Sequence, residues 1–123
     1  MGWAFLLPDG QWEAGAVEKG GLVTPPVNDG FWCQPMADPN PRMVSLEYDA
    51  YKELAVPSGD VEAARRVEAR IDRRYFVLVL HNCTNDTHDV LNAYGAHLPN
   101  PSDPGNWKPN DWFAKIPAPE VQL

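Results

Sequence analysis

The chain has 123 residues, a formal net charge of −7 and 44% hydrophobic residues, which fits one compact domain with a substantial core. The negative charge argues against a nucleic-acid partner, because non-specific affinity for phosphate comes from Lys and Arg. No apolar run reaches the roughly 18 residues that span a bilayer, and residues 3–7 are too short for a signal-peptide core and lack basic residues before them. We therefore expect a soluble chain without a membrane span. If the chain is exported, its export would depend on something other than a signal peptide.

The N-terminal part predicts a hairpin followed by a long loop. Residues 3–7 are apolar, a Pro-Asp-Gly turn follows, and residues 11–18 alternate as a returning strand. Residues 20–41 are rich in turn-forming prolines and contain the aromatic pair Phe31 and Trp32. This pattern favours an ordered loop that packs its aromatic side chains on the sheet.

The middle of the chain predicts a short strand over residues 43–47, a brief helix over 48–54 and a longer helix over 60–72. The evidence is best for the last of these. Its apolar residues recur at three- and four-residue spacing, arginines take the other side, and Asp60 supplies a capping oxygen. The arginine side is interpreted as a solvated face.

The segment over residues 75–80 is apolar on both faces, which is typical of a central strand. A helix over 84–94 follows and ends at Gly95, where a left-handed C-cap falls. Residues 98–123 form a Pro-rich tail, with Trp107, Trp112 and Phe113 expected to anchor it on the domain. We expect one α+β domain over residues 1–123, with a small antiparallel sheet packed by two or three helices.

Cys83 lies at the junction between the predicted central strand and the following helix. A thiol there faces unpaired backbone N–H groups and the positive end of the helix dipole, so its thiolate is stabilised and becomes a candidate nucleophile. The alternative is a small buried core residue, because Cys83 shares the apolar stripe of the helix. Cys33 and Cys83 could form one disulfide in an oxidising compartment, but two cysteines are too few for a disulfide scaffold, and two reduced thiols are the favoured interpretation.

The strand, the triplet Asn82-Cys83-Thr84 and the helix up to Gly95 resemble the Asn-Cys motif of the permuted papain-like superfamily of cysteine hydrolases and acyltransferases. That superfamily includes lecithin retinol acyltransferase, cell-wall endopeptidases and bacterial toxin domains, and the chain is most similar to polymorphic toxin or effector domains. The resemblance implies a papain-like (permuted) fold and a thiol that attacks an amide or ester carbonyl.

The resemblance also implies a histidine base on the opening strand, where this chain has Trp3. Three explanations stay open: a longer N-terminus that carries the histidine, a catalytically silent relative, or a base supplied by a local histidine. His81 is the candidate for the last role, although it is also explained as a histidine that is hydrogen-bonded at a strand end. Glu18 lies where the orienting polar residue of the superfamily is expected, or is an exposed hairpin carboxylate. Asn82 either orients a substrate carbonyl or caps the helix.

Function is therefore expected to be that of a cysteine-dependent hydrolase or acyltransferase, acting on a peptide, peptidoglycan or lipid as a bacterial effector that is cytoplasmic before export or delivered by a secretion system. Trp3, Trp32 and Trp112 are the candidate aromatic contacts. The alternatives are a silent binding module and an acidic immunity-type partner of a toxin, and a cognate immunity or secretion protein is a possible partner. His81, Cys83, Asp86 and His88 are close in sequence and are ligand types for zinc, but they come from one strand end and one helical turn, and His81 and His88 would point apart. No cofactor or metal is therefore expected.

Overall fold

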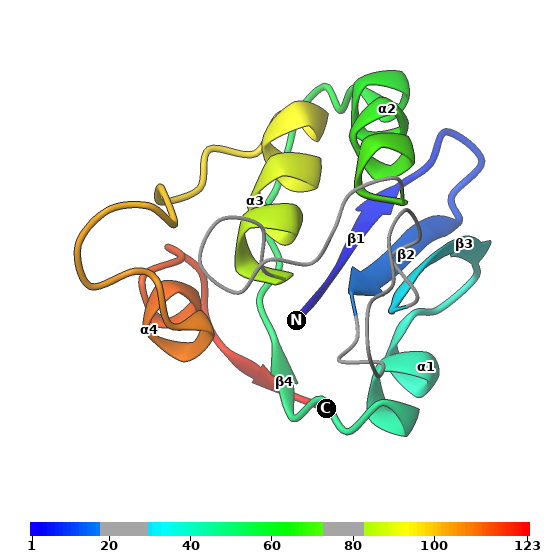
Figure 1. Ribbon diagram of the computed structural model, residues 1–123. Coiled ribbons are helices and arrows are strands. Elements are labelled where there is room, and N and C mark those ends of the chain that lie inside the picture. Colours follow the sequence, from blue (N-terminus) through cyan, green and yellow to red (C-terminus); the bar gives the residue numbers. More distant parts are fainter. Residues whose placement is uncertain (18–29, 73–82) are drawn as a thin grey trace.

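The computed structural model describes residues 1–17, 30–72 and 83–123, and the segments 18–29 and 73–82 lie outside the described residues. Figure 1 shows a small sheet beside two helices that run in opposite directions. The C-terminal part of the chain lies mainly on the side of these helices away from the sheet. The strands are β1 (Gly2–Leu6), β2 (Trp12–Val17), β3 (Phe31–Met36), β4 (Ala50–Tyr51) and β5 (Val121–Gln122). The helices are α1 (Asn40–Ser45), α2 (Val61–Asp72), α3 (Cys83–Tyr94) and α4 (Pro109–Ala114).

The main sheet has the order β1-β2-β3 and is antiparallel throughout. The predicted hairpin is confirmed: the tight turn is closed by a hydrogen bond from the Leu7 N–H to the Gln11 carbonyl, at 2.8 Å. Trp3 lies opposite Gly15 in the register. A side chain at Gly15 would put its Cβ 2.7 Å from the Trp3 ring, so this position of β2 has room only for glycine.

Helices α2 and α3 pack against each other and against the sheet, and the core lies between them. Both helices were predicted from the sequence, and both predictions are confirmed. The core cluster of buried side chains comes from β1, β2, α2 and α3 and consists of Trp3, Phe5, Leu7, Val17, Ala64, Val67, Ile71 and Val90. The protein is therefore an α+β molecule with a small antiparallel sheet, in which the two longest helices cover one side of the core.

The ends of these helices are held by the contacts that their sequences indicate. Asp60 caps α2 by accepting a hydrogen bond from the Ala63 N–H at 3.0 Å. Gly95 has a φ of 125° after α3, and the Ala96 N–H donates to the Leu91 carbonyl at 2.9 Å. This is the six-to-one bond of a Schellman motif, which only a residue with a positive φ can form easily. Tyr94 ties this end to β1, because its hydroxyl donates to the Leu6 carbonyl at 2.9 Å.

The Pro-rich tail packs through Trp112, which lies in α4 and is fully buried. Its indole N–H donates to the Pro99 carbonyl at 2.7 Å. The last residues form β5, which pairs with β4. Phe113 is half-buried, with the Lys52 ammonium 5.1 Å from its ring centroid. Trp107 was expected to anchor the tail, and this expectation is wrong because its side chain is 68% exposed.

Three local predictions are wrong, each because a distant partner or a proline decides the structure. The predicted loop over residues 20–41 contains β3, an edge strand whose pairing with β2 tolerates Pro35 at the edge. The predicted strand over 43–47 is largely α1, because Pro41 in the first turn favours a helix start. The predicted helix over 48–54 contains β4, whose partner β5 lies about seventy residues further along the chain.

The predicted central strand over residues 75–80 lies outside the described residues. Among the helices of the described segments, none has the length and apolar character needed to cross a bilayer.

Candidate functional site

Cys83 is the first residue of α3, one position before the start predicted from the sequence. Its side chain is half-buried and packs against the core cluster. The apolar stripe that Cys83 was expected to share faces the core, since Thr87 and Val90 of α3 are buried and Leu91 also contacts the core. The junction therefore places the Cys83 thiol at the helix N-terminus, on the side that faces the sheet. The first turn of α3 also holds the buried carboxylate of Asp86, which the same positive helix end stabilises.

The histidines that the structure describes do not pair with this thiol. His88 has its Nδ1 3.0 Å from Asp89 Oδ1, and its ring lies edge-on to Trp112 with centroids 6.4 Å apart. His97 is exposed beyond the end of α3. His81, Asn82 and Glu18, the sequence candidates for the base, the carbonyl contact and the orienting residue, lie outside the described residues.

The three candidate tryptophans lie in different places. Trp3 is buried in β1 and Trp112 is buried in α4, so both rings pack inside the protein. Trp32 is half-buried on β3, with the Arg42 guanidinium 5.1 Å from its ring centroid. The indole N–H of Trp32 has no hydrogen-bond partner among the described residues.

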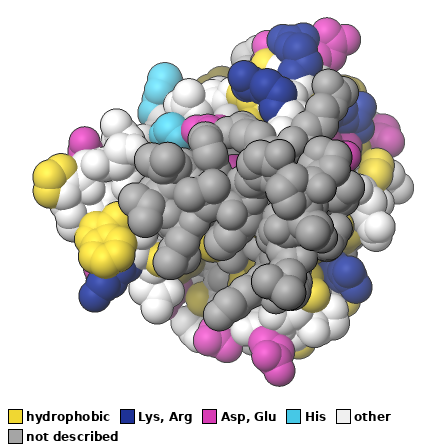
Figure 2. Space-filling view, viewed as in Figure 1, with side chains coloured by type: hydrophobic (Ala, Val, Ile, Leu, Met, Phe, Trp, Pro, Cys, Tyr) yellow, Lys and Arg dark blue, Asp and Glu magenta, His cyan; other side chains and the backbone are white. Residues whose placement is uncertain are grey.

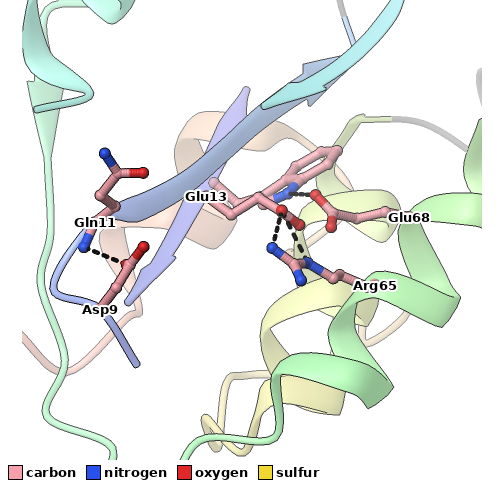
Figure 3. A network of polar contacts seen from close by, with 6 residues as sticks. Asp9, Gln11, Glu13, Arg65 and Glu68 are labelled. Carbon is pink, nitrogen blue, oxygen red and sulfur yellow. Dashed lines mark hydrogen bonds and ion pairs between the residues drawn. The ribbon is translucent and has the colours of Figure 1, made fainter. Parts of the chain in front are cut away.

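A buried polar cluster lies between the sheet and α2, and the sequence interpretation missed it. We call it the Glu13–Glu68 cluster; its members are Trp3 of β1, Glu13 of β2, Cys33 of β3, and Arg65 and Glu68 of α2. Figure 3 shows Glu13 between Arg65 and Glu68.

The contacts in this cluster are short and well defined. Arg65 binds Glu13 Oε1 twice, through Nε at 3.0 Å and through a terminal nitrogen at 2.9 Å. The Trp3 indole N–H donates to Glu68 Oε2 at 3.0 Å. Glu13 and Glu68 are only 5% and 2% exposed. The described members of the cluster thus include two buried carboxyl groups but a single guanidinium group.

Burial and the neighbouring carboxylate separate the acidities of the two glutamates. Burial raises the pKa of Glu68 to about 8, and its hydrogen bond with Glu13 acts in the same direction. Burial alone would raise the pKa of Glu13 as well, but hydrogen bonds with Glu68 and Arg65 lower it overall. At neutral pH the pair therefore holds one proton, which belongs mainly to Glu68.

Cys33 lies at the rim of this cluster. Burial of its sulfur and the carboxylates of Glu68, once it is ionised, Glu13 and Asp72 raise the pKa of its thiol to about 12. The cluster borders a surface depression of about 300 Å³, lined by Glu13, Phe31, Cys33, Arg65, Glu68, Ala69 and Asp72. Cys33 is therefore a protonated, weakly reactive thiol, in contrast to the role proposed for Cys83.

A larger depression of about 570 Å³ lies between α2 and α3, with Ala63, Val67 and Ala93 among its lining residues and Arg66 and Arg70 beside them. Basic side chains gather over α2 in Figure 2, as the sequence predicts for the solvent side of this helix. No group of three or more potential metal-binding side chains is found in the parts of the chain that the structure describes.

The sequence does contain one signal for the Glu13–Glu68 cluster. Glu68 lies four residues after Ala64 and three before Ile71, which places a carboxylate within the apolar stripe of α2. A charged residue in that stripe needs a buried partner, but the identity of that partner depends on how α2 packs on the sheet.

Comparisons of the chain with models of known families, with curated proteins and with solved structures find no match.

Proposed function

We propose that this chain performs cysteine-dependent acyl chemistry, as a hydrolase or acyltransferase, with Cys83 as the nucleophile. The observation that supports this best is the position of Cys83 at the start of the twelve-residue helix α3. Backbone N–H groups of a first helical turn lack partners within the helix, so they stabilise a thiolate and can also bind an oxyanion. The resemblance of Asn82-Cys83-Thr84 and the following helix to the permuted papain-like superfamily supports the same role.

In the proposed reaction, the Cys83 thiolate attacks the carbonyl carbon of an amide or ester, and a carbon–sulfur bond forms. The resulting oxyanion accepts hydrogen bonds from the first turn of α3. When the intermediate collapses, the amine or alcohol leaves with the proton that the base had taken from the thiol, and a thioester remains. Water, or an acceptor hydroxyl or amine, then attacks the thioester and releases the thiol. His81 is proposed as the base, Glu18 as the residue that orients it and Asn82 as a contact of the substrate carbonyl.

The substrate is proposed to be a peptide, a peptidoglycan cross-link or a lipid ester, and the setting that of a bacterial toxin or effector with a cognate immunity or secretion protein. Trp32 is the candidate aromatic contact that is partly accessible, because its residue on β3 is only half-buried. Trp3 and Trp112 would act by shaping the domain, since both rings are buried.

The test is whether an acyl-enzyme forms on Cys83 and not on Cys33. The purified chain is incubated with p-nitrophenyl acetate, with peptidoglycan fragments and with phospholipid vesicles, and the cysteine peptides are analysed by mass spectrometry. We expect an acyl adduct on Cys83 and loss of turnover in Cys83→Ala, while the matched variant Cys33→Ala keeps it. Turnover by Cys83→Ala at the rate of the unmodified chain with any of these substrates would overturn the proposal.

A second candidate function, a catalytically silent binding module, is favoured by one specific observation. Residue 3, where the resemblance implies a histidine base, is a buried tryptophan whose indole N–H is used in a bond to Glu68. If the chain is such a module, a partner that is captured with the unmodified chain should bind Cys83→Ala equally well. A partner that binds the unmodified chain but not Cys83→Ala would count against it.

A further inference from the structure

One oxygen of the Glu68 carboxyl group is buried without a donor among the described residues. The side chain is 2% exposed, and its Oε2 accepts the hydrogen bond from Trp3. Its Oε1 receives no hydrogen bond from an N–H or O–H group of the described residues. An ionised carboxylate in this position would carry an unsatisfied buried acceptor, which is strongly unfavourable.

The charges around Glu68 add to this problem. From β2 it faces the carboxylate of Glu13, which raises its pKa, whereas the Cys33 thiol of β3 donates a hydrogen bond to it and has a smaller, opposite effect. On α2, Asp72 borders the same depression, and Arg65 uses both of its bonds on Glu13. From β1 it faces only the neutral indole of Trp3, and no titratable group of α3 in the described part of the chain influences it. Among the described residues of the cluster, Arg65 is the one cation, and its two hydrogen bonds go to Glu13, so Glu68 receives only its longer-range attraction.

A proton on Glu68 resolves both difficulties at once. The protonated carboxyl group has an O–H that it can donate to Glu13, so the buried oxygen gains a partner and the repulsion between the two carboxylates disappears. The pKa of Glu68, raised to about 8 by burial and by Glu13, agrees with this geometry. The shared proton then joins α2 to β2, beside the bond that joins α2 to β1 through Trp3.

We propose that Glu68 acts as a proton-controlled latch: its carboxyl proton, donated to Glu13, holds α2 on the sheet, and loss of this proton loosens α2. The latch goes beyond the proposed function, because it uses neither Cys83 nor any residue of the proposed reaction. It is a pH-sensitive device built into the contact between a helix and a sheet.

The direction of the pH dependence follows from linkage. The folded pKa of Glu68 lies above its unfolded value of 4.5. The stabilising contribution is therefore complete below pH 4.5 and is lost as the pH rises towards 8. Each pH unit in that window lowers the folding equilibrium constant by up to about tenfold, and the contribution becomes constant once Glu68 is ionised in both states.

The direct test is an NMR titration of the unmodified protein, in which the carboxyl carbon of Glu68 and the indole N–H of Trp3 are followed from pH 4 to 10. We expect the Glu68 carbon to titrate with a midpoint between pH 7 and 9. The Trp3 indole N–H, which donates to the same carboxyl group, should shift with that midpoint. A Glu68 midpoint below pH 6, or a Trp3 indole resonance that does not respond to it, would overturn the latch.

A pair of variants separates the latch from a general effect of charge on α2. In Glu68→Gln, the side-chain amide donates permanently to Glu13, so the urea midpoint should lose the pH dependence that the unmodified protein shows between pH 6 and 9. Glu62→Gln changes an exposed glutamate in the first turn of the same helix and should keep that dependence. Equal pH dependence in the unmodified protein and Glu68→Gln refutes the proposal, and if Glu68→Gln does not fold, the carboxyl titration of the unmodified protein decides.

Discussion

The two cysteines are expected to differ in reactivity in the opposite order to their exposure. Cys33 is exposed and Cys83 is half-buried, so accessibility alone would make Cys33 the faster thiol. However, although the residue as a whole is exposed, its sulfur is partly buried against the cluster, and this burial together with three neighbouring carboxylates raises the pKa of Cys33 to about 12, from an ordinary value of 9.0. Alkylation requires the thiolate, so the surroundings of Cys33 work against its labelling.

The size of this effect can be worked out. A rise of the pKa from 9.0 to about 12 reduces the thiolate fraction at pH 8 about 1,000-fold. A more basic thiolate is intrinsically more nucleophilic, with a Brønsted coefficient of about 0.4–0.5, and this returns a factor of roughly 20. Cys33 should therefore react with iodoacetamide about 50-fold more slowly than an unperturbed thiol.

The assay is time-resolved labelling with iodoacetamide at pH 8, with both cysteine peptides quantified by mass spectrometry and glutathione as the reference thiol. Under the proposed function, Cys83 labels faster than Cys33. Glu68→Gln removes one of the acidic neighbours and should speed up labelling of Cys33 without changing that of Cys83. If Cys33 reacts as fast as glutathione, the electrostatic argument is refuted, and equal, slow labelling of both cysteines would count against the nucleophile at Cys83.

Three further predictions concern the fold around the site. Trp112→Phe should lower the free energy of unfolding in urea by about 1–3 kcal/mol, because it leaves the Pro99 carbonyl without its donor; an unchanged urea midpoint would contradict this. Gly15→Ala should cost about 1–3 kcal/mol, since the new Cβ would meet the Trp3 ring at 2.7 Å, and a thermal melt at the unmodified temperature would show that the ring moves freely. Arg65→Ala should destabilise the protein at pH 7 and much less at pH 2. The pKa of Glu13 is lowered partly by Arg65. The stability that the Glu13–Arg65 pair contributes is therefore present above the unfolded pKa of Glu13 and is lost as the pH falls through its folded pKa. Equal destabilisation at both pH values would mean that Arg65 acts through packing alone.

Local patterns in the sequence were sufficient for the elements whose signals repeat within a few residues. The helix near residues 60–72 shows its apolar stripe, its Asp60 cap and its arginine side directly in the sequence, and α2 follows them closely. The same holds for α3, for its Gly95 end and for the first hairpin. These features depend on backbone geometry and on contacts between residues three or four positions apart, which a sequence displays.

The sequence also identified Cys83 as a residue at a helix start, and the described structure agrees with that position. It did not determine whether a base reaches the thiol, because the approach of an imidazole depends on tertiary packing. The histidine proposed for that role, His81, lies outside the described residues.

Tertiary structure alone decided β3, β4 and the Glu13–Glu68 cluster. Strands β3 and β4 become strands because β2 and β5 pair with them, and neither pairing can be recognised from the local sequence. Glu13 and Glu68 are 55 positions apart in the numbering, and each has an ordinary explanation as a surface carboxylate when read alone. Only the packing of α2 on the sheet buries both of them beside one guanidinium, and burial is what turns two unremarkable glutamates into a pair that holds a proton at neutral pH.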